Sequence, residues 1–386
     1  MTKQRKVNII GGGVIGLSLG WELSQRGLDV TIIQKDTAKQ TTSWTAGGIL
    51  PAANLARAID PLDQLRGFSH ELYQDWVSQL ESATQIDCGF RRCGGWYLAN
   101  TPGERASMIG MTRYWDELGI SCEAVSRSEL AVQEPRLQAW IESQPSASAW
   151  WVADEWQVRP PRLLRALRMA CQSKGVQFVD NTSVRQIETA NSGPRYRIGN
   201  DWHDCDDLIL CAGAWSGEVG ESLGLRHSIV PVRGQVLLLK TEKLELKSIV
   251  NVGHRYLIPR DDGHVLVGSC EEETGFETGT TPKMLETFSQ FAETLVPSLR
   301  NAERVAAWSG IRPMTFDGFP MIGRVPEHPK LFVAAGHFRS GWHLAPATAK
   351  CMAALVLGDS PAVSLDAFNI GSKQIKSEHH ASILTQ

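Results

Sequence analysis

The chain begins with the pattern of a strand, a glycine turn, a helix and a second strand. Residues 7–10 form a short apolar run, and three glycines follow it. Over 14–26 the apolar residues Ile15, Leu19 and Leu23 recur at helical spacing, and Gly27 stands where a helix would end. Residues 30–33 form a second apolar run. This order predicts a βαβ unit with the glycines at its first turn.

Helical and strand patterns then come in separate blocks. Apolar spacing predicts helices over 62–80, 108–118, 160–175 and 282–295, and a last helix from near Ala345 to just before Gly358. Strand patterns fall at 176–179, 184–187, 208–211, 236–239, 256–258, 265–267, 305–308 and 331–334.

Nucleotide-type segments therefore recur at the start, near 176–216 and at 331–357, with a β-rich part between them. We predict a mixed α/β (α+β) fold in which a Rossmann-type nucleotide domain is built from 1–85, 150–220 and 305–370. A β-rich substrate domain would combine 86–149 and 221–304. Residues 371–386 would form a polar tail.

The composition limits the kinds of partner that can be expected. The 39 Lys+Arg against 42 Asp+Glu give a net charge of −3, which does not attract the chain to nucleic acid or to an anionic membrane. No apolar run approaches the about 18 residues of a membrane span, and the run at 7–10 is too short for a secretion signal. The eight cysteines include no C-x-x-C pair. We expect a cytoplasmic protein without a metal, nucleic acid or membrane partner.

The glycine turn matches G-x-G-x-x-G through Gly11, Gly13 and Gly16, with Val14 and Ile15 between. Such glycines make the tight turn, let the backbone approach a pyrophosphate and allow close helix–strand packing. The helix N-terminus adds N–H donors and partial positive charge. With a strand before it and a helix after it, the motif predicts dinucleotide binding.

The residue that closes the second strand would bind the adenosine ribose, and it is Gln34 rather than an acidic residue. Gln34 can hydrogen-bond a hydroxyl, though more weakly than a carboxylate does. Lys35 leaves a 2′-phosphate as an alternative. Hydroxyl and small residues follow at 41–50, and this spacing favours a flavin over a nicotinamide.

Several segments together resemble the glycine oxidase / D-amino-acid oxidase group of FAD-dependent flavoproteins, and among these the bacterial glycine oxidases of thiamine biosynthesis. The resemblance covers about residues 5–370. It is carried by 11–16, 42–50, 212–217, 256–260, 308–323 and 336–348. Gly310-Ile-Arg-Pro313 and the last of these segments are the most specific. The resemblance implies non-covalently bound FAD.

The same resemblance implies roles for individual positions. It places the FAD phosphates at the glycine turn, the ribose near Gln34 and Lys35, and the adenine near the Val184 backbone. It assigns further cofactor contacts to Thr42, Ser43, Ala46, Gly47, Gly48, Ala212, Gly213, Trp215, Arg312, Arg339, Ser340, Gly341 and Trp342. The substrate carboxylate falls to Arg312, with Tyr256 and Arg339 nearby, and these three are the expected catalytic residues.

Elementary chemistry supports the substrate site. Arg offers a planar fork of donors that matches a carboxylate, and in a water-poor pocket such a pair orients the Cα–H toward flavin N5. A substrate that binds with a neutral amine and transfers a hydride needs no acid–base side chain. The imine would hydrolyse, oxygen would become hydrogen peroxide, and the helix starting near Ala345 would stabilise charge on the reduced flavin.

Two departures from the family pattern concern the substrate pocket. Trp342 and His343 stand after Gly341 where small or aliphatic residues are usual, and Glu271 stands where the family places an apolar residue. A buried carboxylate is costly unless paired, so Glu271 either points outward or meets a cation. We therefore predict a pocket that differs from that of the glycine enzymes, with Glu271 and Trp342 at its wall.

The expected activity is oxidation of glycine, sarcosine or small D-amino acids, with a link to thiamine biosynthesis. Two alternatives stay open: a dehydrogenase that uses an acceptor other than oxygen, and a flavin-binding protein that has lost catalysis. The expected partners are a small amino acid or amine and O2. A homo-oligomer is also expected.

Overall fold

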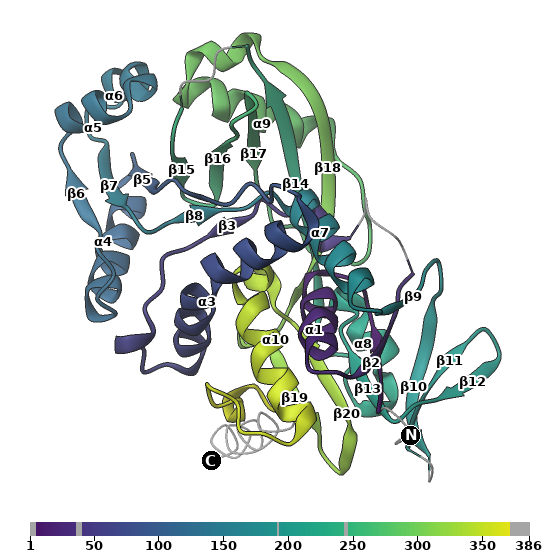
Figure 1. Cartoon of the computed structure of the whole chain (residues 1–386). Coiled ribbons are helices and arrows are strands. Elements are labelled where there is room, and N and C mark those ends of the chain that lie inside the picture. Colours follow the sequence, from purple (N-terminus) through teal and green to yellow (C-terminus); the bar gives the residue numbers. More distant parts are fainter. Residues whose placement is uncertain (1–4, 36–40, 191–192, 243–245, 371–386) are drawn as a thin grey trace, which may run out of the picture.

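A computed structural model describes residues 5–35, 41–190, 193–242 and 246–370 (Figure 1); the predicted tail lies outside them. Its first sheet has six strands in the order β19-β20-β13-β1-β2-β9, drawn from both ends and the middle of the chain. All neighbouring pairs are parallel except β19 with β20. The strands are β1 (Lys6–Ile10), β2 (Asp29–Ile33), β9 (Gln177–Val179), β13 (Asp207–Leu210), β19 (Met321–Val325) and β20 (His328–Ala335).

A second sheet has eight strands in the order β18-β14-β17-β16-β15-β5-β7-β6. These are β5 (Gly95–Ala99), β6 (Glu123–Val125), β7 (Ser148–Val152), β14 (Val230–Lys240), β15 (Ile249–Val252), β16 (Arg255–Pro259), β17 (His264–Gly268) and β18 (Glu303–Met314). Two small sheets complete the described strands: β10 (Val184–Ala190), β11 (Gly193–Ile198) and β12 (Asp201–Asp204), and β3 (Ile49–Leu50), β4 (Arg91–Arg92) and β8 (Trp156–Gln157).

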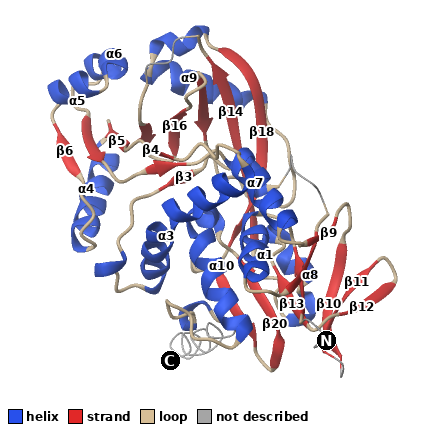
Figure 2. Cartoon of the chain, in the orientation of Figure 1, coloured by secondary structure: helices blue, strands red, loops and turns tan. Residues whose placement is uncertain are grey.

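Helices gather on the two sheets separately (Figure 2). The four helices α1 (Val14–Gln25), α3 (Pro61–Thr84), α7 (Pro160–Ser173) and α10 (Gly341–Leu357) contact one another beside the six-stranded sheet. Helix α9 (Pro282–Leu295) contacts the eight-stranded sheet. The remaining described α-helices are α2 (Thr42–Thr45), α4 (Pro102–Glu117), α5 (Arg127–Gln133), α6 (Gln138–Ser143) and α8 (Ser216–Val219).

The six-stranded sheet is covered on both faces, as its continuous apolar strands require. Val7 and Ile9 of β1 belong to the core cluster that holds α1, α3, α7 and α10. Ile10 belongs instead to the cluster with Val184 and Tyr196 of the β10–β12 sheet. Successive side chains of a strand therefore pack on opposite layers.

Helix α9 packs on one face of the eight-stranded sheet. Leu237 and Val267 pack with Phe288 of α9 in a large apolar cluster. Tyr256 and Trp308 belong to a smaller cluster on the other face. That second face lines a cavity described below.

The predicted mixed α/β fold is confirmed, but several element boundaries were wrong. Helix α4 begins at Pro102 rather than 108, β14 begins at Val230 rather than 236, and β18 extends to Met314 rather than 308. Helix α10 begins at Gly341, not near Ala345, and contains Pro346 in its interior. Proline lacks the N–H that would bond the Trp342 carbonyl. The hydroxyl of Tyr73 on α3 donates to that carbonyl at 3.1 Å, so the helix continues through the proline.

The predicted division into domains stays a prediction. Its boundary at residue 305 falls inside β18, which pairs with β14 of the eight-stranded sheet from residue 303 to 314. Strand β7 of the same sheet likewise crosses the boundary at residue 150.

Candidate active site

The glycine turn opens into a cavity of about 460 Å³ between β1, β2 and the start of α1. Most residues predicted for cofactor binding line it. These are Gly11, Gly13, Val14, Ile15, Gln34, Lys35, Thr42, Ser43, Ala46, Val184, Ala212, Gly213, Trp215, Arg339, Gly341 and Trp342. Thr182, Ser183, Arg185 and Glu218 also line it and carried no motif that could have identified them.

The glycines of the motif have separate tasks. Gly11 has φ +111°, and a Cβ there would lie 2.2 Å from the Cys211 carbonyl oxygen. Gly16 does not line the cavity; a Cβ there would lie 1.9 Å from the Gly11 oxygen, so Gly16 serves close packing of α1. The Ser43 hydroxyl accepts a hydrogen bond from Val14 N at 2.9 Å and thereby satisfies one free donor of the helix N-terminus.

Gln34 is held in one orientation at the ribose position. Its Nε2 donates to Asp180 at 2.6 Å, and Arg168 donates to the same carboxylate, which holds the pKa of Asp180 below its usual value against the effect of desolvation. The Gln34 Oε1 atom lies against Gly12, where a Cβ would be only 1.7 Å away. The Gln34 amide oxygen, which can accept from a hydroxyl, thus lies next to the N–H donors of the helix N-terminus. This arrangement fits the ribose and pyrophosphate of FAD.

A second cavity, of about 370 Å³, continues from the first. The two share Thr42, Ala46, Phe338, Arg339 and Trp342. The second is also lined by the predicted residues Gly47, Gly48, Tyr256, Arg312 and Ser340. Both groups of predicted residues therefore meet at one continuous site, while their individual roles stay predictions.

Two paired glycines make room for the side chains of Arg312 and Thr45. Gly234 of β14 and Gly310 of β18 are register partners. A Cβ on Gly234 would lie 2.2 Å from the Arg312 guanidinium, and one on Gly310 would lie 1.9 Å from the hydroxyl of Thr45. The guanidinium donates to Cys270 O and Ser269 Oγ, both at 2.9 Å. Burial lowers the pKa of Arg312 from its usual value, though the group remains a cation.

Tyr256 lies beside this guanidinium on the same face of the sheet. A Cβ on Gly268 would lie 2.8 Å from the Tyr256 ring, so the glycine lets the ring lie flat over β17. Burial raises the pKa of Tyr256, partly offset by the neighbouring Arg312. Tyr256 is therefore a neutral hydroxyl that shares the Arg312 end of the cavity.

Glu271 is not among the residues that line either cavity, which corrects its predicted place at the pocket wall. It accepts from Arg339 Nε at 2.6 Å, so it meets a cation, and this pair keeps the pKa of Glu271 low despite partial burial. Arg339 lines both cavities, so its pairing with Glu271 neutralises the positive charge at their junction.

Trp342 does line both cavities, and its Nε1 donates to Ser43 O at 2.9 Å. This bond ties the start of α10 to the segment after the glycine turn. His343, the next residue, is buried beside His70, at 5.7 Å between ring centroids, and lines neither cavity.

Several polar residues of the second cavity were not predicted. Glu155, Asn251, Tyr97 and His254 all line it. The Asn251 side chain donates to Glu155 Oε1 at 2.9 Å across 96 positions of sequence. No local spacing could have indicated this contact.

Arg260 holds the loop around Gly47, near the junction of the two cavities, on the side away from the cavities. Its Nη2 donates to Gly47 O at 2.7 Å, and its Nη1 donates to Gln157 Oε1 at 2.6 Å and Val158 O at 2.9 Å. Burial lowers the pKa of Arg260 to about 10.

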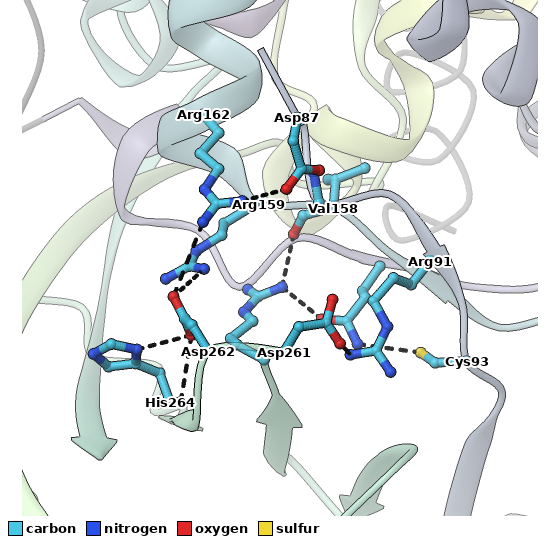
Figure 3. Close-up of polar contacts among 12 residues, drawn as sticks. Asp87, Arg91, Cys93, Val158, Arg159, Arg162, Asp261, Asp262 and His264 are labelled. Carbon is cyan, nitrogen blue, oxygen red and sulfur yellow. Dashed lines mark hydrogen bonds and ion pairs between the residues drawn. The ribbon is translucent and has the colours of Figure 1, made fainter. Parts of the chain in front are cut away.

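Beside Arg260, ion pairs join the neighbouring strands and α7 (Figure 3). Arg162 pairs with Asp87 at 2.6 Å, and Arg159 pairs with Asp262 at 2.5 Å. Gly47, at the substrate side, is thus anchored in a dense polar cluster.

Within the described part of the chain, no group of three or more His, Cys, Asp or Glu is placed to hold a metal ion. The helices found there are too short or too polar to cross a membrane.

Comparison with known proteins places this site in a family. The FAD-dependent oxidoreductase family matches residues 6–355. The chain is 32% identical to a glycine oxidase of Geobacillus kaustophilus over 96% of this chain and 97% of that protein. The crystal structure of glycine oxidase from Geobacillus kaustophilus superposes with a TM-score of 0.89 at 31% identity, covering 96% of this chain and 99% of that one.

Another relative is longer and carries a different name. The bifunctional protein ThiO/ThiG of Nostoc sp. is 28% identical over 96% of this chain, which corresponds to 55% of that protein. The expectation of a flavin rather than a 2′-phosphorylated nicotinamide nucleotide is confirmed. The chain belongs to the FAD-dependent oxidoreductase family.

Proposed function

We propose that this protein oxidises the Cα–N bond of an α-amino acid, with glycine, sarcosine and small D-amino acids as the first candidates. One amino acid, one O2 and one water would give a 2-oxo acid, ammonia or an amine, and hydrogen peroxide. The relatives named glycine oxidase support this class of reaction.

The observation that carries the proposal is the Arg312 guanidinium at the wall of a cavity that continues from the cofactor cavity. Its contacts to Cys270 and Ser269 use only some of its N–H donors and fix its plane. A guanidinium held in this way binds a carboxylate through two parallel hydrogen bonds. The Tyr256 hydroxyl, neutral because burial raises its pKa, adds a donor at the same end.

Bound FAD would accept the two electrons of the reaction and pass them to oxygen. The chain's own residues would bind and orient. Arg312 would fix the carboxylate, Gly47 would leave room beside the Tyr256 hydroxyl, and Trp342 would exclude water from the junction of the two cavities. In this arrangement catalysis rests on positioning rather than on an acid–base side chain. The Nostoc relative's name supports a further prediction, a role in thiamine biosynthesis.

The test is Arg312→Ala against wild type, with peroxide release measured for glycine, sarcosine, N-alkylglycines and both enantiomers of small amino acids. Loss of the carboxylate partner is expected to lower kcat/KM roughly 30- to 5,000-fold. This corresponds to a loss of about 2–5 kcal/mol of transition-state stabilisation. FAD content, read from the absorbance spectrum, should stay near the wild-type value.

Two results would contradict the proposal. Arg312→Ala with unchanged kcat/KM would remove Arg312 from substrate binding. Wild-type protein that holds FAD, reduces it with an amino acid but releases no peroxide would favour an acceptor other than oxygen.

A further inference from the structure

The second cavity has a polar end that the proposed function does not use. Tyr97, Asn251 and Tyr256 are register partners on the neighbouring strands β5, β15 and β16, so their side chains share one face of the sheet. Gly268 of β17 is the next partner in this row. The row therefore leads from the Arg312 end of the cavity to a second end at β5.

Glu155, which follows β7, lies at that second end. It is fully buried, and its Oε1 accepts from Asn251 Nδ2 at 2.9 Å. The hydroxyl of Tyr97 donates to its other oxygen. Gly95 leaves space for the carboxylate, because a Cβ there would lie 2.1 Å from Oε1. This arrangement is built around a carboxyl group.

The carboxyl group has no cation beside it. Among the described residues, no Lys, Arg or His forms an ion pair with Glu155. Burial accordingly raises the pKa of Glu155 to about 7, while Tyr97 and Asn251 counteract part of that rise. A buried carboxylate without a cation is costly, and a positively charged ligand in the adjoining cavity would offset that cost.

Asn251 is the group that such a ligand would meet first. One N–H of its Nδ2 donates to Glu155, and its amide oxygen can accept a hydrogen bond from a donor in the cavity. Glu155 would supply negative charge from behind this oxygen.

The two ends of the cavity are too far apart for one glycine. Ser269, which contacts Arg312, directly follows β17, and Asn251 lies on β15, two strands away. Two strand spacings amount to about 10 Å. The α-amine of an amino acid is only two bonds from the carboxylate carbon, so a group that reaches Asn251 must be several bonds further along the substrate.

We infer that Glu155, Asn251 and Tyr97 form a subsite for a second, positively charged group of the substrate. The preferred substrates would then be amino acids with a basic side chain or a basic N-substituent. This inference rests on the proposed function, because it takes the substrate carboxylate to lie on Arg312.

The experiment compares pairs of nearly equal shape, one charged and one neutral: ornithine with norleucine, both enantiomers, and N-(2-aminoethyl)glycine with N-propylglycine. For each pair, the ratio of kcat/KM is measured with the FAD-bound enzyme, wild type and Glu155→Gln. We expect wild type to prefer the charged member by at least about tenfold, on the scale of a buried charge pair, and Glu155→Gln to lose that preference.

Glu134→Gln is the matched control. Glu134 is also buried, and burial likewise raises its pKa to about 7, but it lines neither cavity. The ratios should be unchanged in this variant. A loss of preference in both variants would attribute the effect to stability and overturn the inference.

The remaining outcomes separate this inference from the proposed function. Oxidation of norleucine or N-propylglycine as fast as of the charged partner would overturn the subsite and leave amino-acid oxidation intact. Oxidation of none of these compounds would refute the proposed function. In that case calorimetric binding decides the subsite: tighter binding of ornithine than of norleucine, lost in Glu155→Gln, supports it, and equal binding overturns it.

Discussion

Two arginines reach the same site under different electrostatic conditions. Among the described residues, Arg312 donates to a carbonyl and a hydroxyl and forms no ion pair, so its charge is available to a ligand. Arg339 is paired with Glu271, and both side chains are partly exposed, at 39% and 38%. The pair therefore keeps a second positive charge from the junction of the two cavities. It makes Arg312 the stronger site for a carboxylate.

Glu271→Val should release the charge of Arg339 into the cavity. We expect KM for a substrate with a second carboxylate, such as D-aspartate, to fall about tenfold, while glycine changes less. Because the pair is half exposed, its loss should change the free energy of unfolding by only about 0–1 kcal/mol. Steady-state kinetics and a thermal melt measure the two effects.

The neighbouring exposed Glu273→Val serves as the control for this change. A clear preference for glycine that stays the same in Glu271→Val would mean that Glu271 does not shape selectivity. The predicted difference from the glycine enzymes would then be wrong.

At this scale the sequence predicted residues that act through their immediate neighbours. The glycine turn and Gly310-Ile-Arg-Pro313 are short motifs whose spacing carries the geometry. Glu155 and Asn251 meet because β5 pairs with both β7 and β15, and Glu271 contacts Arg339 across 68 positions of sequence. Such contacts depend on tertiary structure, which no local pattern contains.

Helix α10 shows how one element depends on another. The Ser69 side chain of α3 hydrogen-bonds the backbone of α10. Its hydroxyl donates to His343 O at 2.5 Å and accepts from Ala347 N at 3.2 Å. Together with Tyr73, it satisfies the groups around Pro346. The apolar spacing predicted a helix start near Ala345, whereas the helix begins at Gly341. The groups that allow an earlier start belong to α3 and could not be predicted from residues 341–357.

Ser69→Ala should therefore destabilise the protein more than a typical serine substitution. Two buried backbone groups would lose their partner, at a cost of about 1–3 kcal/mol in the free energy of unfolding. Urea unfolding followed by circular dichroism measures the change. Ser78→Ala, exposed on the same helix, should change stability by less than about 0.5 kcal/mol. Equal effects of the two substitutions would refute this role of Ser69.

The whole molecule brings its two sheets together through segments that alternate along the chain. The β1–β2 pair from the start and the β19–β20 pair from the end join through β13 in one sheet. Arg260 of the polar loop after β16 donates to the carbonyl of Gly47, which lines the second cavity. The site thus exists only when distant parts of the chain are folded together, so its ionisable groups report on global stability.

Glu155 links that stability to pH. Its pKa is about 7 in the folded protein and near the usual 4.5 when unfolded. Between these values the folded state holds a proton that the unfolded state releases, so this contribution to stability falls as pH rises from about 4.5 to 7 and then stays constant. From pH 5 to pH 8 the loss amounts to about 2 kcal/mol.

Glu155→Gln should remove this dependence, so its stability relative to wild type is expected to rise by about 2 kcal/mol from pH 5 to pH 8. The difference between the two proteins is the proper quantity, because buried His337, whose pKa is lowered to about 3, acts oppositely: stability is lost as pH falls below the usual histidine pKa. That contribution is common to both proteins and cancels. Chemical unfolding of the FAD-bound forms at both pH values gives the result. A difference that does not change with pH would mean that Glu155 is ionised in the folded protein at pH 5, and that the cavity supplies it with a positive charge of its own.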